Sequence, residues 1–181
     1  MRKRGLPALI LAMGLGACLG PRIEDFKETT PAFVPEEYFI GTTQVWGIFQ
    51  DRFGTVRRQF VADVVGSFDN ETLILDESFR FADGTTDKRI WRIVHLGEGR
   101  YEGRANDVIG VAIGEAVGQS FHLSYNVDLE VGDGSWRVHF DDWLLLQPDG
   151  TVINRATVTK FGIKVGELSA FFRKPSGTPG S

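Results

Sequence analysis

The sequence predicts an all-β fold, in the form of an up-and-down antiparallel β-barrel of about eight or nine strands. Three observations predict it: turn signals recur at short intervals, the segments between them alternate apolar and polar residues, and glycines interrupt the stretch most like a helix. Strands joined by short hairpins would leave two open sheet edges, and closure into a barrel removes both. A two-sheet β-sandwich is the alternative architecture.

Hairpin connections are indicated by short segments rich in Asp, Asn and Gly. In residues 51–54, Asp at the first position and Gly at the fourth suit a type I turn, while Asp-Gly steps supply the positive φ that tight hairpins need. Further signals lie at residues 69–70, 83–84, 97–99, 132–134 and 148–150. Neighbouring strands are therefore expected to pair antiparallel.

Alternation is clearest in residues 121–131, where every odd position from Phe121 to Val131 is apolar and every even position is polar. Residues 73–81 and 136–140 repeat the pattern. A period of two residues is typical of a strand with one dry face and one wet face. These segments are therefore expected to turn one face towards a shared interior.

Residues 107–118 form the stretch most like a helix, but Gly110, Gly114 and Gly118 recur there at every fourth position. Each glycine disfavours a helix by about 0.8 to 1.0 kcal/mol relative to alanine. We therefore expect these glycines to mark a bend or a close approach of strands, with a short plug or lid helix as the alternative.

The N-terminus has the pattern of a bacterial lipoprotein signal. Basic residues 2–4 precede an apolar run at residues 6–15, and Leu15-Gly16-Ala17-Cys18 resembles a lipobox. The run is shorter than the about 20 apolar residues that span a bilayer, which favours a processed signal. Cys18 is the only cysteine of the chain and is expected to carry the acyl chains, such as palmitate. An ordinary secretory signal with a chance cysteine is the alternative.

Four segments follow from this pattern. Residues 1–17 are the expected signal peptide, 18–35 the lipidated cysteine and a proline-containing tether, 36–174 one β-barrel domain, and 175–181 a disordered tail. Leu19 stands where an Asp would retain a lipoprotein in the inner membrane. The expected location is therefore the periplasmic face of the outer membrane, with the membrane itself as a partner through Cys18.

Charge limits the other partners. The chain has a formal net charge of −4, and removal of the three basic residues in the signal takes the mature chain to −7. A chain of this charge repels nucleic acids and anionic lipids, so it is not expected to bind either in general. A single lipidated cysteine also leaves no intrachain disulfide, so packing alone must stabilise the fold.

Four segments stand out along the domain: residues 45–54 (VWGIFQDRFG), 75–84 (LDESFRFADG), 89–91 (RIW) and 141–143 (DDW). In this order they resemble the uncharacterised bacterial lipoprotein family of domain of unknown function 3833. The resemblance runs from about residue 30 to residue 174 and implies no particular reaction, ligand or catalytic residue. The shape that it implies is similar to a lipocalin or calycin, although Gly41 precedes Trp46 by five residues instead of the two of the lipocalin signature.

Two acids lie on predicted apolar faces. Glu77 shares the parity of the apolar residues in 73–81, and Asp142 shares that of Phe140 and Leu144. A carboxylate in an apolar interior is either protonated or paired with a cation, because desolvation disfavours its charged form. Polar partners are available on other strands, since one strand face carries Arg89 or Arg92 and another carries Asn154 or Arg155. The sequence therefore predicts a buried cluster built from these residues.

The cluster has two interpretations. It is either an ion-pair network that fixes strand register, or the polar floor of a ligand pocket in which Phe and Trp side chains, Trp91 among them, hold an apolar tail. The second interpretation predicts a non-catalytic protein that binds a small apolar or amphipathic, lipid-like molecule. The main alternative is an envelope interaction protein with a filled barrel, acting through its loops or through outward Trp46, Trp91 and Trp143.

Enzyme signatures are weak. A hydrolase that uses Glu77 and Asp142 ranks third, and it would need carboxyl groups about 5 to 9.5 Å apart. Ser120 and His122 share a strand face, but the sequence defines no acid to orient the histidine. The three histidines are scattered, and no nucleophile elbow or phosphate-binding loop is present. We therefore expect no metal and no cofactor.

Overall fold

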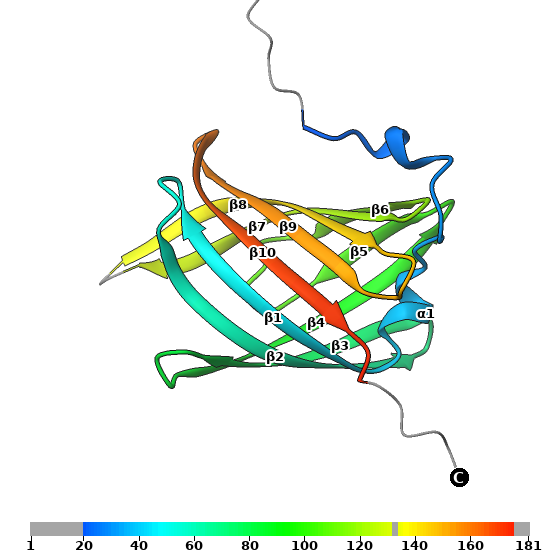
Figure 1. The fold of residues 1–181 in the computed structure, drawn as a ribbon, viewed down its shortest axis with the longest axis horizontal. Helices are drawn as coiled ribbons and strands as arrows, with labels where there is room; N and C mark the ends of the chain where they lie inside the picture. The colour runs from blue at the N-terminus through cyan, green and yellow to red at the C-terminus, as the bar shows by residue number, and fades with distance from the viewer. Residues whose placement is uncertain (1–19, 132–133, 176–181) are drawn as a thin grey trace, which may run out of the picture.

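A computed structural model describes residues 20–131 and 134–175. Ten antiparallel strands close into one barrel, in which each strand pairs with its neighbours along the chain and the last strand pairs with the first (Figure 1). The strands are β1 (Gly41–Asp51), β2 (Val56–Asp69), β3 (Thr72–Phe81), β4 (Thr86–Gly97), β5 (Arg100–Arg104), β6 (Ala112–Val117), β7 (Ser120–Val131), β8 (Gly134–Leu146), β9 (Val152–Lys160) and β10 (Ile163–Arg173).

The predicted up-and-down barrel is confirmed, with ten strands in place of eight or nine. The additional pairing comes from β5 and β6, which are only five and six residues long and show little alternation in the sequence. Gly114 lies in β6, where a Cβ would stand 3.0 Å from the Tyr101 Cβ and 3.1 Å from Leu123. The expected close approach of strands is therefore correct, and the alternative of a helix over residues 107–118 is wrong.

Side chains alternate between the interior and the outer surface, as the sequence predicts. On β7, Phe121, Leu123, Tyr125 and Val127 are all buried, while the residues between them face outwards or are partly exposed. The other long strands behave in the same way, so one apolar core runs along the inside of the barrel.

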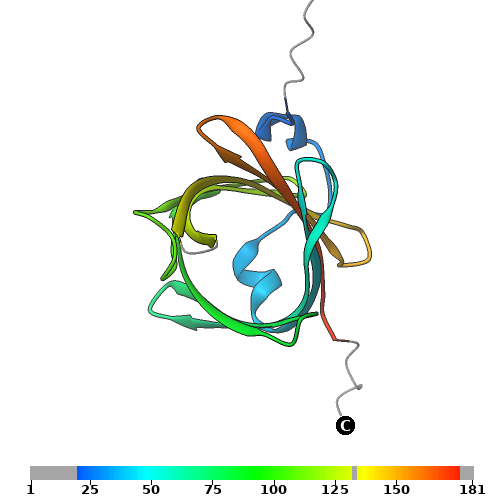
Figure 2. The same cartoon turned by 90° about the vertical axis from the view of Figure 1, so that its left-hand side faces the viewer.

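One end of the barrel is covered by the chain that precedes β1. Helix α1 (Pro35–Phe39) sits across this end, and Figure 2 shows it behind the lumen when the barrel is viewed from the other end. Phe33 and Phe39 are each only 3% exposed, and the ring of Phe33 meets that of Phe121 edge-on at 6.0 Å. A Cβ at Gly66 would stand 1.9 Å from the Phe39 carbonyl oxygen, so only glycine allows the helix to approach β2 this closely.

Part of the expected tether, residues 18–35, packs against the barrel together with α1. The 3-10 helix η1 (Ile23–Phe26) contacts β6 and β7, and Thr29 Oγ1 accepts a hydrogen bond from the Gln119 amide at 3.0 Å. The assignment of residues 18–35 to a free tether is therefore wrong from residue 23 onwards, because Phe33 is a core residue. The signal peptide, Cys18 and residues 176–181 lie outside the described residues.

The opposite end of the barrel carries the hairpin turns β1–β2, β3–β4 and β9–β10 and the longer loop between β5 and β6. No helix crosses this end in Figure 2. Within residues 20–131 and 134–175, no helix is long and apolar enough to cross a membrane.

Replacement of Phe33 by Ala is expected to lower the free energy of unfolding by about 3 to 5 kcal/mol, because the truncated ring leaves a cavity in the core. The matched control Phe53→Ala removes a ring that is 78% exposed, and its effect should stay within about 0.5 kcal/mol. Urea unfolding of the mature chain, followed by tryptophan fluorescence, measures both. Equally small effects would show that residue 33 belongs to a free tether.

Candidate ligand-binding cavity

The barrel encloses a cavity of about 620 Å³ that lies between α1 and the end opposite α1. Eight-stranded barrels are just wide enough for side chains to fill, so ten strands leave interior space. The volume falls within the range of about 300 to 1,000 Å³ that is typical of small-molecule sites. Most of the wall is apolar, formed by residues such as Phe39, Val45, Phe60, Phe79, Leu123, Phe140, Leu168 and Phe172.

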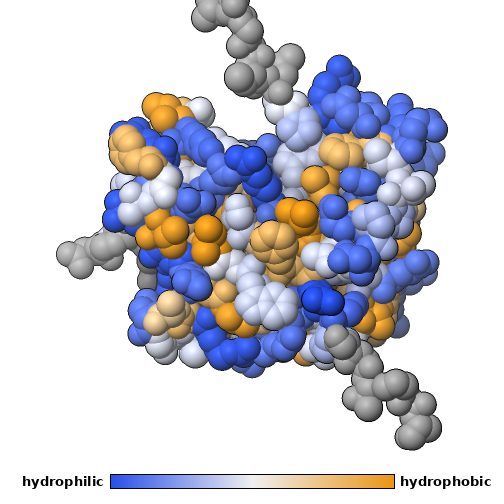
Figure 3. Space-filling model, viewed as in Figure 1, coloured by the Kyte–Doolittle hydropathy of each residue, from blue (hydrophilic) through white to orange (hydrophobic). Residues whose placement is uncertain are grey.

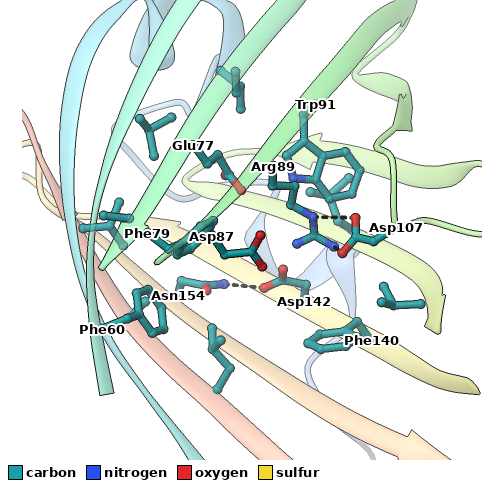
Figure 4. A pocket seen from close by; sticks show the side chains of 18 of the residues that line it. Phe60, Glu77, Phe79, Asp87, Arg89, Trp91, Asp107, Phe140, Asp142 and Asn154 are labelled. Carbon is teal, nitrogen blue, oxygen red and sulfur yellow. Dashed lines mark hydrogen bonds and ion pairs between the residues drawn. The ribbon is translucent and has the colours of Figure 1, made fainter. Parts of the chain in front are cut away.

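Polar side chains interrupt this apolar wall halfway along the strands. On the inner face of β3, Glu77 lies between Leu75 and Phe79, and it pairs across the sheet with Arg89 of β4. On β8, Asp142 lies between Phe140 and Leu144 in the same way. The strand parity predicted that both acids face the interior, and the structure confirms it (Figure 4).

Arg89 forms an ion pair with Asp107, an acid of the β5–β6 loop. Its Nε donates to Asp107 Oδ1 at 2.9 Å and its Nη2 lies 2.7 Å from Asp107 Oδ2, a bidentate pair (Figure 4). The guanidinium group also lies 4.8 Å from the centre of the Trp91 ring. Asp107 and Trp91 therefore fix the position of the cation, and two of its five N–H donors point to Asp107.

Asp142 is held by two donors from neighbouring strands. The Asn154 amide donates to Asp142 Oδ1, and the Tyr125 hydroxyl donates to Asp142 Oδ2 at 3.2 Å. Burial raises the pKa of Asp142, while the hydrogen bonds from Asn154 and Tyr125 act in the opposite direction. The side chain is therefore partly buried, and each of its two carboxylate oxygens accepts one hydrogen bond.

Glu77 differs from Arg89 and Asp142 in its contacts. Within the described part of the chain it has no hydrogen-bond or ion-pair partner, and in Figure 4 its carboxyl group points into the cavity without one. Burial raises the pKa of Glu77 to about 7, Arg89 partly opposes this rise, and Asp107 and Asp142 add to it. Glu77 is thus an acid that can change its charge near neutral pH while it faces the cavity.

The structure decides between the alternatives that the sequence left open. Arg89 and Asn154 face the interior, whereas Arg92 is exposed and Arg155 pairs with Glu167 on the outer surface. The placement of Arg92 and Arg155 in the cluster is therefore wrong, because each is one residue away from the inward parity of its strand. Parity also puts Trp91 inside, at 5% exposure, so its placement on the outside is wrong.

Trp46 and Trp143 lie on the outer surface of the barrel, as the alternative of an envelope interaction protein predicts. Trp46 is 43% exposed, and Trp143 stacks on His122 at 4.2 Å. His122 Nε2 lies 2.5 Å from Asp141 Oδ1 on this outer face, but the buried Ser120 hydroxyl has no partner in the described structure. Ser120 and His122 therefore do not form a nucleophile and base pair.

Two members of the site were missed by the sequence analysis. Asp107 lies in a loop without periodicity, and nothing in the residue order signals its contact with Arg89. Tyr125 stands at an apolar position in the alternation of β7, and only its hydroxyl group signals a polar partner on a neighbouring strand. Within the described residues, no group of three or more His, Cys, Asp or Glu side chains is arranged to hold a metal ion.

Glu77 makes stability dependent on pH. Its pKa of about 7 lies above its ordinary value of 4.5, so between these values the folded protein binds more protons than the unfolded chain. The free energy of unfolding should therefore fall as pH rises through this window. Glu77→Gln should flatten the fall and stabilise the protein at pH 8 by an amount on the order of 1 to 3 kcal/mol.

Urea unfolding at pH 5, 6, 7 and 8 measures this effect. The control is Glu115→Gln, which changes an exposed acid on β6 and should leave the pH dependence as it is. A Glu77→Gln protein that is less stable than the wild type at pH 8 would contradict the expectation.

Comparison with known proteins supports the barrel and the resemblance but gives no activity. No curated protein matches the sequence. Among solved structures, the S-type phycobiliprotein lyase CPES from Guillardia theta is similar, with a TM-score of 0.55 and 10% sequence identity over 78% of this chain and 92% of that chain. At this identity the similarity shows the fold alone, a lipocalin-like barrel.

A family model described as a protein of unknown function, DUF3833, matches residues 12–174. The match covers nearly the whole chain, from within the N-terminal apolar run to the end of the barrel. The four segments that suggested this family in the sequence all lie inside it. The chain therefore belongs to the DUF3833 family of uncharacterised proteins.

Proposed function

We propose that this protein is a lipoprotein of the outer membrane, facing the periplasm, that binds a small apolar or amphipathic molecule inside its barrel without catalysis. The cavity of about 620 Å³ is the observation that carries the proposal. A filled barrel would leave no such space, so the cavity favours ligand binding over the alternative of an interaction protein that acts through its surface.

The chemistry of the wall supports an amphipathic ligand. Apolar side chains lie on both sides of the buried acids, since Leu75 and Phe79 flank Glu77 on β3, and Phe140 and Leu144 flank Asp142 on β8. Burial of apolar ligand surface supplies affinity of roughly 25 cal/mol per Å², and a few polar groups fix orientation. A ligand with apolar parts around one polar group fits this arrangement.

The membrane anchor is supported by the sequence around Cys18. The family match begins at residue 12, so it includes the cysteine and its lipobox-like residues. Each buried methylene contributes roughly 0.8 kcal/mol, so two or more acyl chains would hold the protein stably at the bilayer.

The rim of the barrel supports a bilayer as the neighbouring surface. Phe53 and Phe161, at the tips of the adjacent β1–β2 and β9–β10 hairpins, are 78% and 92% exposed. Cations accompany the rings, since the Arg52 guanidinium lies 4.7 Å from the Phe53 ring centre and Lys160 Nζ lies 3.8 Å from that of Trp136. Figure 3 shows apolar patches at this corner of the molecule, a composition that suits the membrane interface.

A hydrolase receives less support from the site. Asp142, one of its two expected carboxylates, is engaged by Asn154 and Tyr125. Glu77 alone faces the cavity without a partner, which suits recognition of a ligand group better than a pair of acids working on one bond.

Filling the cavity tests ligand binding. Ala62→Phe places a ring in the cavity wall of β2 and should weaken binding of a neutral apolar dye such as Nile red at least tenfold. Val65→Phe adds the same ring to the outer face of β2, where Val65 is exposed, and should leave binding unchanged. Fluorescence titration measures both, and native mass spectrometry of the wild type shows whether a ligand co-purifies. Equal binding by the two variants would place the dye outside the barrel.

Lipidation of Cys18 is tested in a bacterium that expresses the full chain. Metabolic labelling with palmitate should mark the wild type, and the label should be absent from Cys18→Ala because no other cysteine can accept an acyl chain. Fractionation should find the wild type in the outer membrane. A Cys18→Ala protein that keeps the label would refute the anchor while leaving the cavity proposal intact.

A further inference from the structure

Carboxylates outnumber cations at the centre of the cavity. Among the described residues, Glu77, Asp107 and Asp142 meet a single arginine there, Arg89, which is already held by the bidentate contact with Asp107. Asp142 has two donors, so the unbalanced negative charge falls on Glu77, which has none in the described structure. Either a proton on Glu77 or a cation that enters the cavity can therefore relieve this charge.

We propose that the polar group of the ligand is a protonated amine held by Glu77, so that the barrel takes an apolar amine. This inference rests on the proposed ligand-binding function and specifies its substrate class. An ammonium group offers up to three N–H donors, and a charged acceptor binds such donors more strongly than a neutral one does.

Desolvation gives the amine its advantage over other polar groups. A lone carboxylate in an apolar cavity is disfavoured in its charged form, and an opposite charge within hydrogen-bond distance removes much of this penalty. A carboxylate or phosphate head group would instead stand beside Glu77 and Asp142, where like charges repel. A hydroxyl group could hydrogen-bond to Glu77, but it would leave the charge unpaired.

The aromatic wall favours the same group. Trp91, Tyr125, Phe79 and Phe140 line the cavity around the carboxylates, and the rings of Tyr125 and Phe140 stack at 5.2 Å. The faces of such rings attract cations by about 0.5 to 2 kcal/mol, more when the cation is desolvated. An ammonium beside Glu77 would thus meet a carboxylate and aromatic rings together.

The mouth of the cavity, at the end of the barrel opposite α1, offers an alternative place for the polar group of a ligand. Arg57 and Arg58 line the outer part of the cavity, and an anionic amphiphile could leave its head group there with its tail inside. Arg57 is paired with Asp51 at 2.7 Å, and the Arg58 guanidinium lies 3.6 Å from the centre of the Phe81 ring. These contacts hold both arginines. Lys88 also lines the cavity but is exposed to solvent, so the interior carboxylate is favoured as the recognition point.

Three amphiphiles with the same chain test the inference: dodecylamine, dodecanol and dodecanoate, each below the concentration at which it forms micelles. Isothermal titration calorimetry measures their binding to the full mature chain with Cys18→Ser at pH 6, 7 and 8. At pH 8 the amine should bind at least tenfold more tightly than the alcohol. Its advantage should shrink towards pH 6, because Glu77 gains a proton while the amine keeps its own.

Glu77→Gln keeps the shape of the side chain and should abolish the preference for the amine at pH 8. The matched control Glu115→Gln changes an exposed acid on β6 that does not line the cavity, and it should keep the preference within about threefold. If Glu77→Gln does not fold, the pH dependence of the wild type decides the question. Tighter binding of dodecanoate, or a preference for the amine that survives Glu77→Gln or does not change with pH, overturns the inference.

The outcome also separates the inference from the function on which it rests. Binding of dodecanol or dodecanoate without binding of dodecylamine overturns the amine and keeps the cavity as a ligand site. Binding of none of the three overturns the amine and counts against ligand binding itself.

Discussion

Closure of ten strands into one barrel is the constraint on which the rest of the structure depends. Closure satisfies the backbone groups of every strand, since β10 returns to pair with β1. It also sets the diameter, because ten strands enclose more space than inward side chains fill. The cavity is therefore a consequence of the strand number, and inward residues such as Glu77 and Asp142 line it.

That geometry explains why polar groups persist in an apolar interior. In a filled barrel, Glu77 would be packed against core side chains without a partner, at a considerable cost in free energy. At a cavity wall it keeps contact with space that water or a ligand can enter. Asp142 and Arg89 are satisfied by protein partners, so they shape the site, and Glu77 is the group left to recognise what enters it.

Strand parity was the part of the fold and the site most readily predicted from the sequence. Alternation in residues 121–131 identifies the inward face of β7, and the same rule places Glu77 and Asp142 inside. Strand parity does not show whether Arg89 or Arg92 faces the interior, because both faces of β4 carry apolar residues as well as an arginine. Asp107 and the packing of Phe33 depend on contacts between segments far apart in the chain, which local patterns do not encode.

The two ends of the barrel differ in how readily a ligand could enter. Phe33, Phe39 and Phe121 pack together at the α1 end, so a ligand that entered there would have to displace core residues. We expect easier exchange at the other end, where the described residues form hairpins and one loop but no helix. Figures 1 and 2 show that the β1–β2 and β9–β10 hairpins rise on the same side of the barrel as the start of the described chain. A lipid anchor just before Gly20 would thus hold the exposed rings of Phe53 and Phe161 towards the bilayer, and the mouth beside them would open next to the membrane from which an apolar ligand would come.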